Sequence, residues 1–179
     1  MGIYKLKKKD VGKIDNLFSG WNETMIWSCL QGYMGTARVD NKYIPKSARI
    51  DIADFCFLAG KPNIDLLKAE PTEKCAGFFI MIPGNKAWHN LIEKIYGSSV
   101  KKIIRYATKK DAKFDLSKLV NITKLECKDY NFEFIGKRLY EEALRNKWSA
   151  DLCSQFKTYE EYRELGIGVA ALYKGELVS

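Results

Sequence analysis

The apolar residues of this chain recur every three or four positions in some segments and every second position in others, so helices and strands are both predicted. Helical spacing is clearest over 22–34, with Asn22 as the expected N-cap, and over 85–97. Segment 47–59 alternates apolar and polar positions at first and is then almost entirely apolar. This pattern predicts one long strand that starts with one wet face and enters the centre of a sheet.

Three consecutive segments predict a β-α-β unit in the first half of the chain. An apolar run over 77–82 precedes the helix capped by Asn85, and a second run, Val100–Thr108, follows it. Strands joined through a helix lie parallel, with a right-handed crossover. The predicted fold class is therefore α/β (mixed α+β), a three-layer arrangement with a mixed sheet and flanking helices.

The second half is predicted to form a separate domain. A charged turn at 109–113 marks the expected division between an N-terminal domain, 1–110, and a second domain, 111–179. The pattern after this turn predicts a strand over Val120–Cys127 and a helix over Asn131–Lys147.

The last residues of the chain predict a capped helix, a glycine stop and a β-hairpin. Thr158 and Glu161 have the spacing of a capping box, and Gly166 is expected to adopt the left-handed conformation after the helix. Lys174-Gly175 is predicted to form the two-residue turn. Because only four residues follow this turn, the polypeptide is expected to end within a domain.

Composition narrows the class of protein. Hydrophobic residues make up 46% of the 179 positions, which excludes a disordered chain. There is neither a transmembrane run nor a signal peptide in the sequence, and a cytoplasmic protein is expected. The five cysteines are scattered without a Cys-x-x-Cys pair and are interpreted as buried, reduced thiols. His89 has no cysteine nearby with which to bind zinc.

The net charge of +8 is concentrated in two segments. Residues 5–13 carry five lysines against one aspartate, and residues 94–113 carry seven basic residues against one aspartate. Such segments suit nucleic acid or an anionic cofactor, or form a solvated rim. Nucleic acid is the less favoured partner, because only Tyr96 and Tyr106 interleave with the second cluster and no nucleic-acid motif is present.

Four residues are candidates for binding a substrate. Trp27 and Gln31 lie on the less apolar face of the helix predicted after Asn22, and Glu23 stands in its first turn. Trp27 either contacts a ligand or packs under the next loop. Asp54 stands in the apolar part of the 47–59 strand, where a carboxylate is costly unless paired. It either belongs to a site or bonds to local backbone at a bulge.

Four stretches, 19–35, 53–63, 104–107 and 148–168, resemble a branch of the GNAT (GCN-five-related N-acetyltransferase) enzymes found in Gram-positive bacteria. This resemblance implies a family-particular N-terminal region followed by the opening elements of an acetyltransferase core. It also implies acetyl-CoA as the cofactor and a primary amine of a small molecule as the acceptor. The general base and acid are not assigned.

The same resemblance predicts that the acetyl-CoA site is missing. These enzymes hold the pyrophosphate on an Arg/Gln-x-x-Gly-x-Gly/Ala turn between a central strand and a helix N-terminus, which is expected only beyond Ser179. The chain is therefore expected to be inactive alone. The alternatives are a non-catalytic binding module or half of a split enzyme with a C-terminal partner chain. The open hairpin edge also predicts a homodimer.

Overall fold

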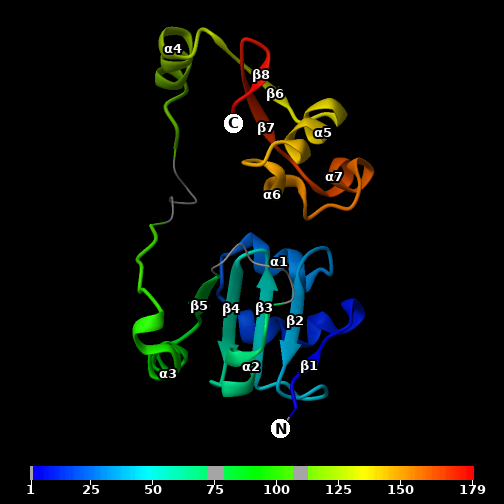
Figure 1. The fold of residues 1–179 in the computed structure, drawn as a ribbon, viewed down its shortest axis with the longest axis vertical. Helices are drawn as coiled ribbons and strands as arrows, with labels where there is room; N and C mark the ends of the chain where they lie inside the picture. The colour runs from blue at the N-terminus through cyan, green and yellow to red at the C-terminus, as the bar shows by residue number, and fades with distance from the viewer. Residues whose placement is uncertain (1, 72–78, 107–112) are drawn as a thin grey trace. The chain divides into compact units, whose positions relative to one another are not determined.

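The computed structural model of the chain describes residues 2–71, 79–106 and 113–179. These residues form two compact units, Met1–Ile103 and Ile104–Ser179 (Figure 1). The division predicted between residues 110 and 111 lies outside the described residues. Each unit has its own sheet and its own hydrophobic core.

The N-terminal unit is built on a five-stranded mixed sheet in the order β1-β2-β3-β4-β5. The pairs β1–β2, β2–β3 and β3–β4 are antiparallel, and β4 and β5 are parallel. Its elements in chain order are β1 (Tyr4–Lys5), the 3₁₀ segment η1 (Lys8–Phe18), α1 (Thr24–Leu30), β2 (Thr36–Val39), β3 (Ser47–Ile52), β4 (Phe55–Gly60), α2 (Ile64–Lys68), β5 (Ile80–Pro83), α3 (Lys86–Tyr96) and η2 (Gly97–Ser99).

Helical segments cover both faces of this sheet, as the side chains of β4 show. Phe57 and Ala59 pack with buried residues of η1 and α1. Cys56 and Leu58 point to the opposite face and pack with α2 and with Trp88 of α3. The mixed α/β fold with flanking helices, predicted from the apolar spacing, is thereby confirmed.

The single strand predicted over 47–59 is wrong, because this segment is a β-hairpin. Ile52 pairs with Phe55, and the two residues between them, Ala53 and Asp54, make the turn, with Ala53 at a φ of +46°. The apolar positions Ala48, Ile50 and Ile52 of β3 lead directly into β4, which is apolar on both faces, so the apolar pattern continues through the turn. Asp54 is a turn-forming residue, but the turn lacks the glycine or asparagine that would have marked it clearly.

The predicted β-α-β unit is also placed wrongly. Helix α3 forms where expected, capped by the Asn85 side chain, which accepts from the Trp88 amide at 3.0 Å. The residues from Val100 to Tyr106 form no strand, and 107–108 lie outside the described residues. The unit occurs one step earlier, since β4, α2 and β5 place two parallel strands side by side. Ile104 is 77% exposed, because the described part of the apolar run from Val100 pairs with no strand of the sheet.

The C-terminal unit pairs three antiparallel strands in the order β6-β7-β8. Its elements are α4 (Leu116–Glu126), β6 (Tyr130–Phe134), α5 (Lys137–Arg145), α6 (Ala150–Cys153), α7 (Tyr159–Leu165), β7 (Val169–Tyr173) and β8 (Glu176–Leu177).

Two predictions for this unit are wrong. The strand expected over Val120–Cys127 is helix α4, which Asp115 caps by accepting from the Lys118 amide at 3.2 Å. The helix expected from Asn131 begins only at Lys137, because β6 comes first. The alternation of Tyr130, Phe132 and Phe134 with polar residues is a strand signal that the helical interpretation overlooked.

The predicted capped helix and hairpin at the end of the chain are confirmed. Thr158 Oγ1 accepts from the Glu161 amide at 3.2 Å, and Glu161 Oε2 accepts from the Lys157 amide at 2.7 Å. Lys174 and Gly175 form the turn, both with positive φ. Gly166 is not left-handed as predicted, because its φ is −102° and its ψ 156°.

Candidate functional site

Three of the four predicted substrate-binding residues lie along α1. Glu23 is the N-cap residue, in place of the predicted Asn22, and Gln31 is the C-cap residue, so the helix ends well before Met34. Trp27 lies between them and is 42% exposed. Positions 23, 27 and 31 are four residues apart, so they share one face of the helix, and all three side chains are exposed.

Asp54 lies in the β3–β4 turn and is half-buried. Its backbone carbonyl accepts from the Ile80 amide at 2.6 Å, which attaches the start of β5 to this turn. Thr36, the first residue of β2, pairs with Asp51 close to the same turn. The register therefore brings Asp54 and the loop that follows Gln31 to the same end of the sheet.

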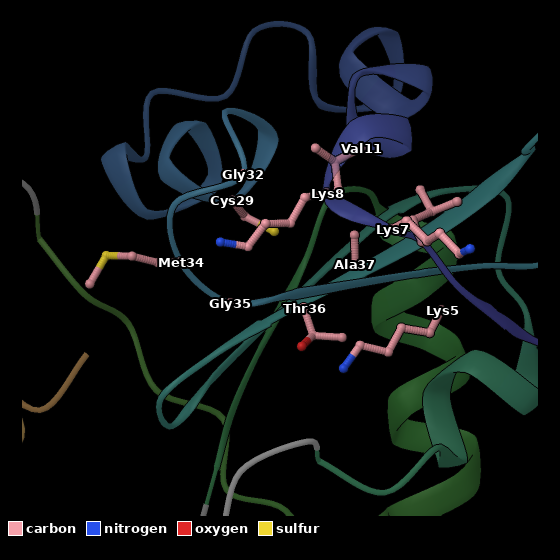
Figure 2. A pocket seen from close by; sticks show the side chains of 11 residues that line it. Lys5, Lys7, Lys8, Val11, Cys29, Gly32, Met34, Gly35, Thr36 and Ala37 are labelled. Atoms are coloured by element: carbon pink, nitrogen blue, oxygen red, sulfur yellow. The ribbon is translucent and has the colours of Figure 1, made fainter. Parts of the chain in front are cut away.

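A hollow of about 410 Å³ lies between the N-terminal segment and the loop after α1 (Figure 2). None of the four predicted residues lines it. Gly35 closes one side, with a φ of +72°, and a Cβ there would lie 2.3 Å from Ile52 Cγ1. The lining residues are Lys5, Leu6, Lys7, Lys8, Val11, Cys29, Gly32, Met34, Gly35, Thr36 and Ala37. The lysine-rich segment 5–13, which stands out in the sequence, supplies Lys5, Lys7 and Lys8 to the lining of this hollow.

The lining of the hollow suits an anionic or apolar group. It includes three lysines and no carboxylate. In Figure 2 the Lys5 side chain lies beside Thr36, whereas the Lys8 side chain extends past Cys29 and Gly32. Cys29 is 1% exposed, and burial together with the negative charge of Asp51 raises the pKa of its thiol to about 12. This thiol is therefore protonated at neutral pH and is a poor nucleophile.

The described cysteines should differ sharply in their reaction with iodoacetamide at pH 8. The pKa of Cys29 and that of Cys56 are raised from 9.0 to about 12, mainly by burial, which lowers their thiolate fraction about a thousandfold. Cys127 is only half-buried and should be alkylated first. Peptide mapping after timed quenching measures each rate, and labelling in urea is the control in which the rates should converge. Equal rates for Cys29 and Cys127 in the folded protein would contradict this expectation.

The raised thiol pKa values also predict the direction of a pH effect on stability. Above pH 9 the unfolded chain loses thiol protons that the folded chain keeps at Cys29 and Cys56. The free energy of unfolding that these groups contribute is therefore complete below pH 9 and is lost as the pH rises towards 12.

A buried ion-pair cluster explains why charged residues occur inside β3. Arg49 is fully buried and donates from Nε to Asp51 Oδ1 at 2.7 Å, and Arg38 pairs with the other carboxylate oxygen. Arg49 Nη1 also donates to the carbonyls of Leu66 and Ala69 at the end of α2, at 2.9 and 2.6 Å. The face of β3 that was predicted to contact solvent is thus covered by α2, and its charged side chains stabilise the fold.

In the part of the chain that the structure describes, no group of His, Cys, Asp and Glu side chains is arranged to hold a metal ion. His89 lies 3.4 Å from Glu93, one helical turn further along α3. The described cysteines, Cys29, Cys56, Cys127 and Cys153, are free thiols. Cys75 lies outside the described residues.

In the C-terminal unit, residues 163–168 have the sequence Arg-Glu-Leu-Gly-Ile-Gly, which matches the pattern Arg/Gln-x-x-Gly-x-Gly/Ala of the pyrophosphate turn. The prediction that this pattern occurs only beyond Ser179 is therefore wrong. Its structural context is nevertheless unsuitable, since Gly166 follows the C-terminus of α7 and precedes a strand. A helix C-terminus carries the negative end of the dipole and repels an anion.

The glycines of this stretch serve close packing. The Gly166 amide donates to the Tyr162 carbonyl at 2.7 Å, so it is not available to a phosphate. A Cβ on Gly166 would lie 2.7 Å from Tyr162 Cδ2, and a Cβ on Gly168 would lie 2.9 Å from Ile135 Cδ1. This stretch does not fit the pyrophosphate of acetyl-CoA.

A family model described as GNAT acetyltransferase matches residues 15–179, which is most of both units. The chain belongs to the GNAT acetyltransferase family. The resemblance drawn from the four stretches is thereby confirmed at the level of the family, whose members generally use acetyl-CoA. No curated protein sequence matches the chain.

A solved structure supports the same assignment. It is the crystal structure of a GCN5-related N-acetyltransferase-like protein from Streptococcus suis 89/1591, which is 39% identical to this GNAT chain with a TM-score of 0.79. The match covers 96% of this chain and 68% of that one, so part of the relative has no counterpart in these 179 residues. The mixed α/β fold is shared.

None of the helices within 2–71, 79–106 and 113–179 is both long enough and apolar enough to cross a bilayer.

Proposed function

We propose that this chain supplies the acceptor-binding region and the opening elements of an acetyl-CoA-dependent N-acetyltransferase of the Gram-positive type, and that these 179 residues do not bind acetyl-CoA alone. The supporting observation is the placement of residues 163–168. They carry the letters of the pyrophosphate turn at the wrong end of a helix, with the Gly166 amide already bonded to Tyr162.

The acceptor is a small molecule with a primary amine, and the exposed face of α1 is its binding surface. The carboxylate of Glu23 complements an ammonium group, and the ring of Trp27 attracts a cation through its π face. Gln31 adds a donor and an acceptor at the end of the same face. Asp54, in the β3–β4 turn at the same end of the sheet as the loop after Gln31, is proposed as a second carboxylate for the acceptor. The lysine-lined hollow repels a cationic amine and is therefore not part of it.

Two considerations favour this proposal over a nucleic-acid-binding role or a purely non-catalytic module. The family match includes both units. In the described part of the basic segment, residues 94–106, regular structure ends with α3 at Tyr96 and η2. The residues after η2 form no sheet or helix on which bases would stack. The cytoplasm is the proposed location, as the family match favours.

Acetyl-CoA should leave the melting temperature of the 179-residue polypeptide unchanged. A ligand at about 100 times its dissociation constant stabilises a folded protein by about 2.7 kcal/mol, which thermal shift detects easily. The full-length Streptococcus suis relative, tested beside it, is the comparator in which the melting temperature should rise. A clear rise for the 179-residue polypeptide would show that its cofactor site is complete and would refute this part of the proposal.

A further inference from the structure

The lysine-lined hollow of the N-terminal unit has no part in the proposed function. Its wall comes from two segments that are distant in the sequence, 5–11 and 29–37. Strand β1 pairs with β2, and the Leu6 amide donates to the Ala37 carbonyl at 2.9 Å. These contacts hold the two segments together, so the hollow is part of the folded framework. Its volume of about 410 Å³ lies in the range of small-molecule sites.

The positive charge around this hollow has no counter-charge. Within the described residues, Lys5, Lys7 and Lys8 make no ion pair, and no carboxylate lines the hollow. The single acidic residue of this lysine-rich segment, Asp10, pairs with Lys13 at 2.8 Å. Three ammonium groups around one space repel one another, so a bound anion relieves an unfavourable interaction.

Other donors face the same space as the lysines. In Figure 2 the Lys5 side chain lies beside Thr36, whose hydroxyl can donate a further hydrogen bond to an anion. Lys7 is also the N-cap residue of η1, and no described side chain caps this start. The amides of the first turn therefore add to the field of the lysines, although they form no site by themselves. Lysine binds phosphate as a point charge, so this arrangement suits a doubly charged oxyanion.

The rest of the lining is uncharged. Leu6, Val11 and Ala37 are almost fully buried and contact the hollow through apolar atoms. Met34 is half-buried, and its flexible thioether adapts to the shape of a ligand. The protonated thiol of Cys29 adds no charge. A ligand that fits both parts of the lining has a charged end and an uncharged organic body.

We propose that the hollow binds a phosphomonoester of a small molecule. Lys5, Lys8 and the Thr36 hydroxyl hold the phosphate, and the organic part lies against Leu6 and Val11. A phosphomonoester carries about 1.5 to 2 negative charges at neutral pH, which matches a pair of lysines better than the single charge of a carboxylate. The site is independent of the proposed function, because none of the four proposed acceptor-binding residues lines the hollow.

Phenyl phosphate is the probe for this site, because it joins a phosphate to an apolar ring. Calorimetric titration of the 179-residue chain should give saturable binding with a Kd below about 1 mM. In the same titration followed by NMR, the backbone amides of Leu6, Thr36 and Ala37 should shift most. Weaker binding, or shifts confined to other parts of the chain, overturns the proposal.

Further ligands define the chemistry of the site. Benzyl alcohol lacks the charge, benzoate lacks the second charge and inorganic phosphate lacks the ring, so each should bind at least about tenfold more weakly than phenyl phosphate. If any of them binds equally well, the phosphomonoester is the wrong ligand class. Displacement of phenyl phosphate by acetyl-CoA also overturns the assignment, since the cofactor is then the occupant.

Two neighbouring lysines provide matched variants. Lys8→Gln removes a lysine of the lining, whereas Lys9→Gln removes an exposed lysine that is not among the described lining residues. Lys8→Gln should weaken phenyl phosphate binding at least about tenfold, and Lys9→Gln less than about twofold. Both positions are exposed, so both variants should keep the urea midpoint of the unchanged protein. Equal weakening by the two variants would mean that the probe senses only the net charge of the segment, and the site would be refuted.

Discussion

Replacing Asp51 with alanine should lower the free energy of unfolding of the N-terminal unit by about 3–5 kcal/mol. The reason is that Asp51 is the carboxylate partner of two guanidinium groups, Arg49 and Arg38. Arg49 is fully buried, so removing Asp51 leaves a buried positive charge that has lost its counter-charge and keeps the carbonyls of α2 and the Phe79 ring as partners. Urea titration followed by the exchange of amide hydrogens in β3 and β4 measures the loss.

A double-mutant cycle separates the pair from the surrounding packing. Asp51→Ala/Arg49→Met removes both charges and fills the space of the arginine stem, so its cost should be clearly smaller than the sum of the two single costs. Amides of β6 and β7 belong to the other unit and should keep their exchange rates. If Asp51→Ala costs less than about 1 kcal/mol, the value of an exposed pair, the structural role given to this cluster is wrong.

Replacing Trp88 with alanine is expected to lower the free energy of unfolding of the same unit by about 3–5 kcal/mol, through loss of burial and formation of a cavity. Trp88 of α3 is fully buried and packs in one cluster with Leu58 of β4 and with Leu66 and Leu67 of α2. Its indole Nε1 also donates to the Gly60 carbonyl at 3.1 Å. The change should appear in the urea midpoint of the N-terminal unit.

The matched variant Trp88→Phe keeps most of the ring and removes the indole donor. The Gly60 carbonyl still accepts from Asn85 Nδ2 at 3.0 Å, so it is not left without a partner. The cost should therefore be about 1–2 kcal/mol, well below that of Trp88→Ala. Similar costs for the two variants would mean that the hydrogen bond, rather than the packing of the ring, is what Trp88 supplies.

Local signals in the sequence predicted several elements correctly. The Asn85 cap of α3, the Thr158 cap of α7 and the Lys174-Gly175 turn each depend on residues within four positions of one another. Such contacts form whatever the rest of the chain does, so they can be read without knowledge of the fold. The family resemblance rested on longer stretches and was confirmed over residues 15–179.

Elements that depend on distant partners were predicted less well. The run from Val100 resembles a strand but found no neighbouring strand, whereas β6 became a strand because β7, about forty residues later, pairs with it. Arg49 and Asp51 resemble a solvated face until α2 is placed over them. The candidate site shows the same limit, since Glu23, Trp27 and Gln31 share one face of α1 by spacing alone, but the lysine-lined hollow required two separated segments.

The sequence by itself determined the family, the mixed α/β class and the capped elements at the end of the chain. Only the tertiary structure decided which apolar runs become strands, which charges are buried, and that Arg163–Gly168 lies at the wrong end of a helix for a pyrophosphate. The physical reason is the distance along the chain between the residues that interact. Caps and tight turns are satisfied by neighbours in sequence, whereas strand pairing, burial of charge and the direction of a helix dipole relative to a loop depend on segments brought together by folding.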